Sequence, residues 1–142
     1  MAAYTTELDC VRTFLLAVHT VATTKHYPVE ASKLSGITDA SFQRMLVHPP
    51  ELMGSDGDSF YWKRYKIEIE EVGEIGLMTA INNILIGIDK FNRRAALGAG
   101  FVYASAPKML HLKYANSDPV KAKSKSGNWK CNIWIDVEWS TS

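Results

Sequence analysis

Residues 129–139 read WKCNIWIDVEW, and this stretch decides the fold. Apolar and polar residues alternate along it, with no glycine or proline between them. One alternating set is Trp129, Cys131, Ile133, Ile135, Val137 and Trp139, and the other is Lys130, Asn132, Trp134, Asp136 and Glu138. Because successive side chains of a β-strand point to opposite faces, the pattern predicts a long antiparallel strand at the centre of a sheet, with one face in the core.

A second stretch, residues 60–72, has the same period of two. Its apolar face contains Tyr61, Tyr65, Ile67 and Ile69, and its other face contains Trp62, Arg64, Lys66, Glu68 and Glu70. The polar face changes from basic to acidic along the strand. It is either a solvated face that deters edge-to-edge pairing or a surface that meets a copy of itself, or a neighbour, through alternating charges.

Two other stretches have apolar residues at helical spacing. Residues 6–23 begin with Thr6 and Asp9, a weak capping box, and residues 77–94 end in Arg93 and Arg94, which suit the carboxyl end of a helix dipole. His19 in the first helix has no carboxylate or second histidine three or four positions away. We therefore predict an ordinary, partly exposed helix histidine and not a ligand or a base.

Shorter elements connect these two strands and two helices. Residues 41–47 and 109–114 predict strands, and residues 101–106 predict a short strand or an extended link. Residues 51–59, rich in Gly, Asp and Ser, predict the turn of a hairpin. A calcium loop around Asp56 and Asp58 is disfavoured because the other acidic positions of a twelve-residue loop are missing.

Two polar stretches predict surface connections. Residues 24–40 have no periodicity and leave room for a short helical turn at 29–34. Residues 116–128 predict a long loop between the last two strands, with Lys121, Lys123 and Lys125 at alternate positions. Together the elements predict a single α+β domain over residues 1–142, in the order α-β-β-α-β-β. We expect a mainly antiparallel sheet of about four strands with two helices packed on one face.

Composition limits the classes of function. The chain of 142 residues is 46% hydrophobic and 22% charged with a formal net charge of +1, so bulk charge does not indicate nucleic acid or an anionic membrane as a partner. Cys10 and Cys131 fall on apolar faces, which predicts buried free thiols in a reducing compartment. No apolar run approaches the roughly 18 residues of a membrane span, and no signal peptide is evident, so we expect a cytosolic, soluble protein.

No motif indicates catalysis. A nucleophile elbow, a P-loop, an HExxH motif, a CxxC pair and a dinucleotide fingerprint are all missing, and the four histidines are scattered. We therefore predict a protein that is not an enzyme, with no catalytic residue, no metal site and no cofactor.

The order of elements resembles the tail terminator, or tail-to-head joining, proteins of long-tailed bacteriophages. In that family an amino-terminal helix precedes a proline-ended strand and an acidic Gly/Asp loop, here FQRMLVHPP and GSDGDS. A strand of aromatic and alternating charged residues follows, here FYWKRYKIEIEEV, then a helix and a final strand pair, here MLHLKY and WKCNIWIDVEW.

This resemblance implies a homo-oligomeric ring, usually of six subunits, that caps the tail tube and meets head-completion proteins. It implies a place in the virion after assembly in the host cytoplasm. Trp62 and Trp134 fall on outward sheet faces, where large aromatic residues are unexpected unless they are covered. We expect a second protein surface, most simply a copy of the same chain in a closed ring, to cover at least one of them. The rival explanation is that the helices and long connections cover both sheet faces within the monomer. We assign partner contacts to Trp62, Arg64, Lys66, Glu68, Glu70, Lys121, Lys123, Lys125 and Trp134. The alternative is a small nucleic-acid-binding module that uses Lys121, Lys123, Lys125 and Lys130.

Overall fold

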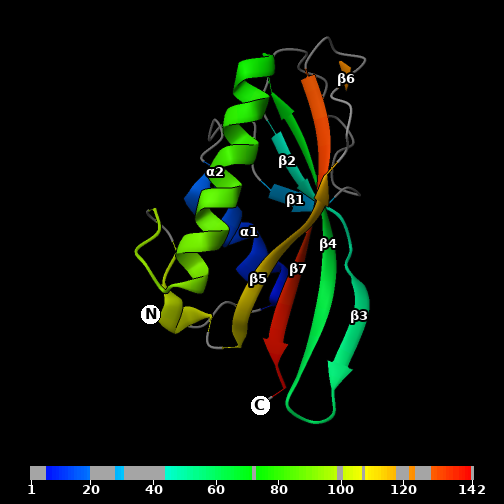
Figure 1. Ribbon diagram of the computed structural model, residues 1–142, viewed down its shortest axis with the longest axis vertical. Coiled ribbons are helices and arrows are strands. Elements are labelled where there is room, and N and C mark those ends of the chain that lie inside the picture. Colours follow the sequence, from blue (N-terminus) through cyan, green and yellow to red (C-terminus); the bar gives the residue numbers. More distant parts are fainter. Residues whose placement is uncertain are drawn as a thin grey trace.

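The computed structural model describes residues 6–19, 28–30, 44–71, 73–98, 101–106, 108–117, 122–123 and 129–141. The helices are α1 (Glu7–Val18) and α2 (Glu74–Asn92), with a short 3₁₀ turn, η2, at Tyr103–Ser105. The strands are β1 (Pro28–Glu30), β2 (Arg44–Val47), β3 (Glu51–Asp56), β4 (Phe60–Glu71), β5 (Met109–Ser117), β6 (Ala122–Lys123) and β7 (Trp129–Ser140). One twisted sheet with both helices packed against it confirms the α+β prediction (Figure 1).

The two longest strands form the centre of the sheet. β4 and β7 pair antiparallel over their full lengths, from Phe60 opposite Ser140 to Glu71 opposite Trp129. The other edge of β7 pairs with β5 and β6, and the other edge of β4 pairs with β2 and then β3. β1 extends the sheet beyond β2 as its parallel neighbour. The predicted central position of residues 129–139 is confirmed.

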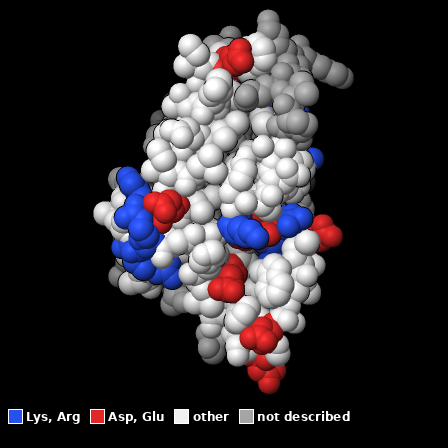
Figure 2. Space-filling model, in the orientation of Figure 1, with Lys and Arg blue, Asp and Glu red and all other residues white. Residues whose placement is uncertain are grey.

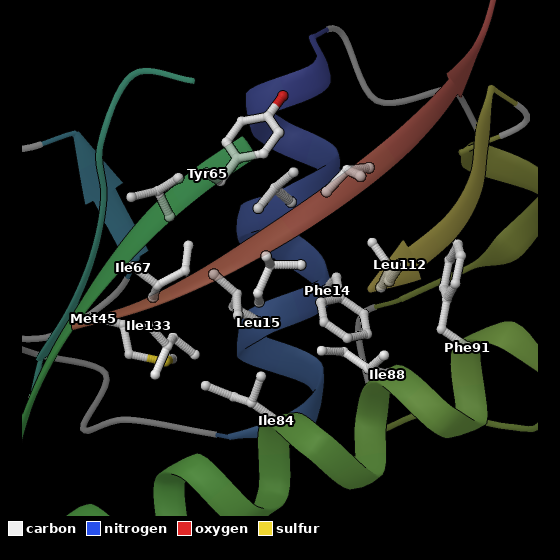
Figure 3. Packing of buried hydrophobic residues seen from close by; sticks show 14 of the residues in the cluster. Phe14, Leu15, Met45, Tyr65, Ile67, Ile84, Ile88, Phe91, Leu112 and Ile133 are labelled. Atoms are coloured by element: carbon white, nitrogen blue, oxygen red, sulfur yellow. The ribbon is translucent and has the colours of Figure 1, made fainter. Parts of the chain in front are cut away.

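The alternation in β4 and β7 places one set of side chains in the core. Tyr65, Ile67 and Ile69 of β4 are buried, as are alternate residues of β7 from Cys131 to Trp139. Both cysteines are buried free thiols, as predicted. Figure 3 shows Ile67 and Ile133 from the sheet facing Leu15 of α1 and Ile84 of α2. The core is therefore a single layer between the sheet and the two helices.

Helix α1 begins as the sequence predicts. The Thr6 side chain accepts a hydrogen bond from the Asp9 backbone N–H at 3.0 Å, the N-cap arrangement that Ser and Thr favour. Glu7 in the first turn accepts hydrogen bonds from Tyr61 and, at 2.8 Å, from Lys63 of β4. The Tyr61 bond to that carboxylate raises the pKa of Tyr61 to about 12. These contacts join the start of α1 to the sheet.

The prediction that residues 51–59 form only a loop was wrong. Residues Glu51–Asp56 form strand β3, and the turn that joins it to β4 is confined to residues 57–59, where Gly57 has φ of +53°. Sequence alternation is weak in β3 because all its residues except Gly54 are exposed. Gly54 lies under the Trp62 ring, and a Cβ there would be 2.5 Å from a Trp62 ring carbon. Glycine is thus required by the close approach of the indole.

Helix α2 begins earlier than predicted. It starts at Glu74 after Gly73, so Gly76 lies inside its first turn. It ends at Asn92, and Arg94 follows with φ of +56°, a conformation that usually selects glycine. The Arg94 guanidinium lies 4.5 Å from the Phe91 ring centroid and donates to the Phe91 and Leu110 carbonyls, which stabilises this turn.

Three connections also differ from the prediction. Residues 103–105 form the 3₁₀ turn η2, where a short strand or an extended link was predicted, and the rings of Phe101 and Tyr103 pack against Phe91. Residues 28–30 form β1, so the helical turn expected at 29–34 was wrong for its first two residues, and residues 31–34 lie outside the described ranges. In the predicted 116–128 loop, β5 extends through Ser117 and β6 spans Ala122–Lys123, while residues 118–121 and 124–128 lie outside those ranges.

Candidate interaction surface

The face of the sheet opposite the helices is the candidate functional surface, and we call it the outer face. It displays the polar alternate residues of β4 and β7, together with residues of β5 and β3 that are their neighbours in the register. The structure therefore brings together five of the predicted contact residues from β4 with Trp134 from β7. The five residues of β4 are Trp62, Arg64, Lys66, Glu68 and Glu70.

A row of alternating charges crosses the outer face at its middle. In the register, Lys113 of β5 lies opposite Asp136 of β7, Asp136 opposite Arg64 of β4, and Arg64 opposite Glu51 of β3. We call these four residues the charge row. Figure 2 shows basic and acidic atoms side by side across the middle of the molecule. Each charge in the row thus has a register neighbour of opposite sign, an arrangement that is favourable between adjacent strands.

The centre of the charge row is a two-bond ion pair. Arg64 Nε lies 2.7 Å from Asp136 Oδ1, and Arg64 Nη2 lies 3.1 Å from Asp136 Oδ2. The hydrogen bond to Asp136 raises the pKa of Arg64, and the nearby Glu51 carboxylate adds to this effect. Because a forked pair fixes both side chains, the outer face presents a defined pattern of charge to a partner.

An open hollow lies beside the charge row. It is lined by Phe60, Trp62, His111, Lys113, Asp136 and Glu138. Trp62 is half-buried there, because its ring covers Gly54 and lies 6.1 Å from the Phe60 ring centroid. The neighbouring β-strands thus cover part of Trp62 within the monomer. Trp134 is also half-buried, between Lys66 and Asn116 in the register.

Glu68 and Glu70 are buried, which contradicts the solvated face, one of the two alternatives for the polar face of this strand. Glu68 is 9% exposed and Glu70 1%. Glu68 lies between two basic side chains, with Lys130 Nζ 3.0 Å from one carboxylate oxygen and His48 Nε2 3.4 Å from the other. A carboxylate is buried at acceptable cost only where such partners lie close. Glu68 and Glu70 are therefore covered, whereas the two ends of the charge row, Glu51 and Lys113, are exposed.

The expectation that His19 is an ordinary, partly exposed residue was also wrong. His19 is 8% exposed, its Nε2 lies 3.4 Å from Glu71 Oε1, and its Nδ1 lies 3.3 Å from the Asn83 amide nitrogen. Both neighbours are distant in sequence, on β4 and α2. Residue spacing within the first helix therefore could not indicate Glu71 and Asn83 as neighbours of His19. Their contacts with His19 connect the end of α1 to β4 and α2.

The predicted lysine cluster is not described. Lys121 and Lys125 lie outside the described residues, and Lys123 is described only as backbone in β6. In the described ranges no group of three or more His, Cys, Asp or Glu residues is arranged to hold a metal ion. Neither helix, over the part of the chain that the structure describes, has the length and apolar character to cross a membrane.

Sequence analysis missed a second kind of surface, which is apolar. Four side chains on the solvent side of α2 are exposed although they are large and hydrophobic, and two more are exposed on β3. They are Ile75, Met78, Leu85 and Ile86 on α2, and Leu52 and Met53 on β3. The spacing of the α2 residues was a usable signal, because residues three, ten and eleven positions apart share one side of a helix.

The Arg64–Asp136 pair gives a testable prediction about stability. We expect a double-mutant cycle with Arg64→Ala and Asp136→Ala, followed by urea denaturation, to give a coupling of about 0.5–1 kcal/mol that falls as salt rises. The Arg93–Asp89 pair is the matched control, because its side chains are 62% and 68% exposed and its coupling should be smaller. Equal coupling in both pairs would contradict a specially ordered charge row.

Comparison with known proteins identifies a chain of similar fold but no sequence family. No protein-family profile and no curated protein sequence matches this chain. The fold is similar to that of a chain in the solved structure of the virion of a native gene transfer agent particle. The TM-score is 0.51 at 12% sequence identity, over 89% of this chain and 84% of that chain. At this identity the likeness is one of fold.

Proposed function

We propose that this chain is a structural protein of virion assembly, a ring-forming tail terminator that caps a phage tail tube and joins it to the head. The observation that carries the proposal is the fold likeness to a chain of a gene transfer agent virion, which extends over 89% of this chain. The order of elements, which resembles tail terminators, supports the same role independently of that comparison.

The accessible part of the outer face supports a contact role. The charge row spans four strands, and its central pair is fixed by bonds of 2.7 and 3.1 Å. Polar, charge-patterned surfaces of this kind give orientation and partner specificity more than raw affinity. A protein that must dock in one orientation on a tube end or a head protein needs that property.

The proposed mechanism is geometric. A closed ring, of six subunits in this proposal, docks on the last ring of tube subunits and covers the surfaces to which the next tube subunits would add. Its opposite side offers no equivalent surface, so polymerisation stops, and that side meets the head-completion protein. The role requires binding and shape but no bond-making step, so we propose that the protein acts without catalysis, in the virion after assembly in the host cytoplasm.

The direct test is the control of tube length. Tube subunits are polymerised with and without the purified chain, and the lengths are measured by electron microscopy. We expect the chain to shorten and narrow the length distribution and to be found at tube ends. Tubes that grow unchanged, while the chain binds an oligonucleotide tightly in moderate salt, would contradict the proposal and favour the nucleic-acid alternative.

The charge row can be tested in the same assay. Lys113 is exposed in β5 opposite Asp136, so Lys113→Glu reverses the sign of the row at an accessible position. We expect weaker capping from Lys113→Glu, and unchanged capping from the matched control Lys113→Arg, which keeps the charge. Equal capping by both variants would mean that the outer face does not take part in the contact.

A further inference from the structure

The two ends of the charge row are charges without an ion-pair partner in the monomer. Glu51 and Lys113 are both exposed, and neither forms an ion pair within the described part of the chain. At the centre of the row, the Arg64 side chain is 35% exposed and two of its five N–H groups bond Asp136. Its other N–H groups can therefore reach an acceptor outside the monomer, so the row has capacity for a second set of ion pairs.

The order of the charges is complementary to itself. From β3 to β5 the charge row is acidic, basic, acidic and basic, and Figure 2 shows red and blue atoms alternating across the middle of the molecule. In the reverse direction every position has the opposite sign. A two-fold axis parallel to the strands, midway between β4 and β7, would therefore place Glu51 against Lys113 of a second copy and Arg64 against its Asp136.

The neighbouring residues of the outer face match under the same rotation. Trp62 lies opposite Glu138 in the β4–β7 register, and Lys66 lies opposite Trp134. The two-fold axis would place Trp62 against Glu138 of the copy and Lys66 against its Trp134. An indole N–H can donate to a carboxylate, and an ammonium group is attracted to an indole ring. The second copy would thus cover both half-buried tryptophans.

The charge pattern also excludes the other face-to-face arrangement. A two-fold axis along the charge row would place each charge against the same residue of the copy, so four pairs of like charges would meet. Like charges placed directly opposite each other are destabilising. The row therefore favours only the axis that is parallel to the strands.

We infer that two copies of the free chain associate through their outer faces, sheet against sheet, about this axis. Aligned packing of two sheets is a common geometry, and the contact is isologous because both copies use the same surface. The surface measures about 15 Å across the four strands and about 20 Å from Phe60 to Lys66 along β4. An interface of this size is typical of weak, reversible association and not of a permanent dimer.

This inference goes beyond the proposed function, in which the outer face docks on a tube end or a head protein. A pair of copies would cover that face in both molecules. Because the association is weak, a docking target can compete for the face and separate the pair.

The experiment reverses the charge at each end of the row. Glu51→Lys leaves two basic ends and Lys113→Glu leaves two acidic ends, so like charges meet across the axis in either variant. We expect each variant to dimerise at least about tenfold more weakly than the wild type at low salt, because the symmetry repeats the unfavourable pair. Mixed in equal amounts, the two variants should form a heterodimer, because the basic ends of one meet the acidic ends of the other. Analytical ultracentrifugation measures both results.

The double variant and two controls complete the experiment. Glu51→Lys combined with Lys113→Glu exchanges the two ends, so opposite charges meet again and dimerisation should return to the wild-type level. Lys113→Arg keeps the charge, and Lys90→Glu changes an exposed charge on α2, away from the outer face. Both controls should dimerise like the wild type. Circular dichroism checks that each variant is folded.

Three results would overturn the inference. A wild-type chain that stays monomeric at about 300 µM in low salt would do so. Single variants that dimerise as well as the wild type would mean that another surface is used. A mixture of the two variants without heterodimer would mean that the charge row does not face its own copy. None of these measurements uses tube subunits, so they leave the capping role to its own test.

Discussion

Replacing Phe91 by alanine is expected to lower the free energy of unfolding by about 3–5 kcal/mol, because it empties the centre of an aromatic cluster. The Phe91 ring centroid lies 5.9 Å from those of Phe14 and Phe101 and 5.6 Å from that of Tyr103. These four rings come from α1, α2 and the segment that contains η2 (Figure 3 shows Phe14 and Phe91). The cavity would therefore loosen several elements together.

The loss has a second cause, at the end of α2. Arg94 has a positive φ, and its guanidinium stacks 4.5 Å above the Phe91 ring centroid. Without the ring, the strained turn keeps its conformational cost and loses part of its support. Urea denaturation followed by circular dichroism measures the effect.

Ile75→Ala is the matched control on the same helix. Ile75 is 81% exposed, so its truncation should change the free energy of unfolding by less than about 0.5 kcal/mol. A Phe91→Ala loss below about 1.5 kcal/mol would mean that the cluster collapses around the cavity and does not hold the helices in place.

The centre of the fold was predictable because its signal is local. In β7 every second residue from Trp129 to Trp139 is apolar, and in β4 the same holds from Tyr65 to Ile69. This period assigns the strand and its core face without knowledge of the partner strand. Residues 133, 135 and 137 are buried as predicted. The same holds for α1, where Thr6 caps the helix by a contact three residues away.

The remaining features depend on contacts between distant residues. β3 has almost no buried residue, so nothing in its own composition distinguishes it from a loop, and its place is set by pairing with β4. Glu68 is buried because Lys130 and His48 approach it from other strands and loops. His19 is buried because Glu71 and Asn83 meet it from β4 and α2. Periodicity assigns a face but cannot identify what covers it.

In the candidate surface too, part was predictable from local sequence and part depends on contacts between distant residues. The sequence places Arg64 and Asp136 on polar faces of two strands, but only the register makes them a pair with bonds of 2.7 and 3.1 Å. The exposed apolar residues of α2 were not predicted, for a different reason. Ile75 precedes the predicted start of the helix at residue 77, and Met78 and Ile86 fall outside the apolar stripe that predicted it.

Replacing Gly87 by valine is expected to lower the free energy of unfolding by about 1–3 kcal/mol, although valine is the better helix former. Gly87 is buried in α2 where Val18 ends α1, and a Cβ at this position would lie 2.2 Å from Val18 Cγ1 and 2.8 Å from Val18 Cβ. Atoms cannot approach so closely, so the helices must separate. The gain in helix propensity, below about 1 kcal/mol, is too small to compensate.

Shortening the opposing side chain should reverse part of this loss. We expect Val18→Ala alone to be mildly destabilising, and Gly87→Val with Val18→Ala to be more stable than Gly87→Val alone. The two substitutions would then be non-additive, as residues in direct contact are. Chemical denaturation of the four proteins completes the cycle. Strictly additive losses would mean that Val18 moves aside freely, and that the close approach of α1 to α2 at Gly87 does not set the spacing of the two helices.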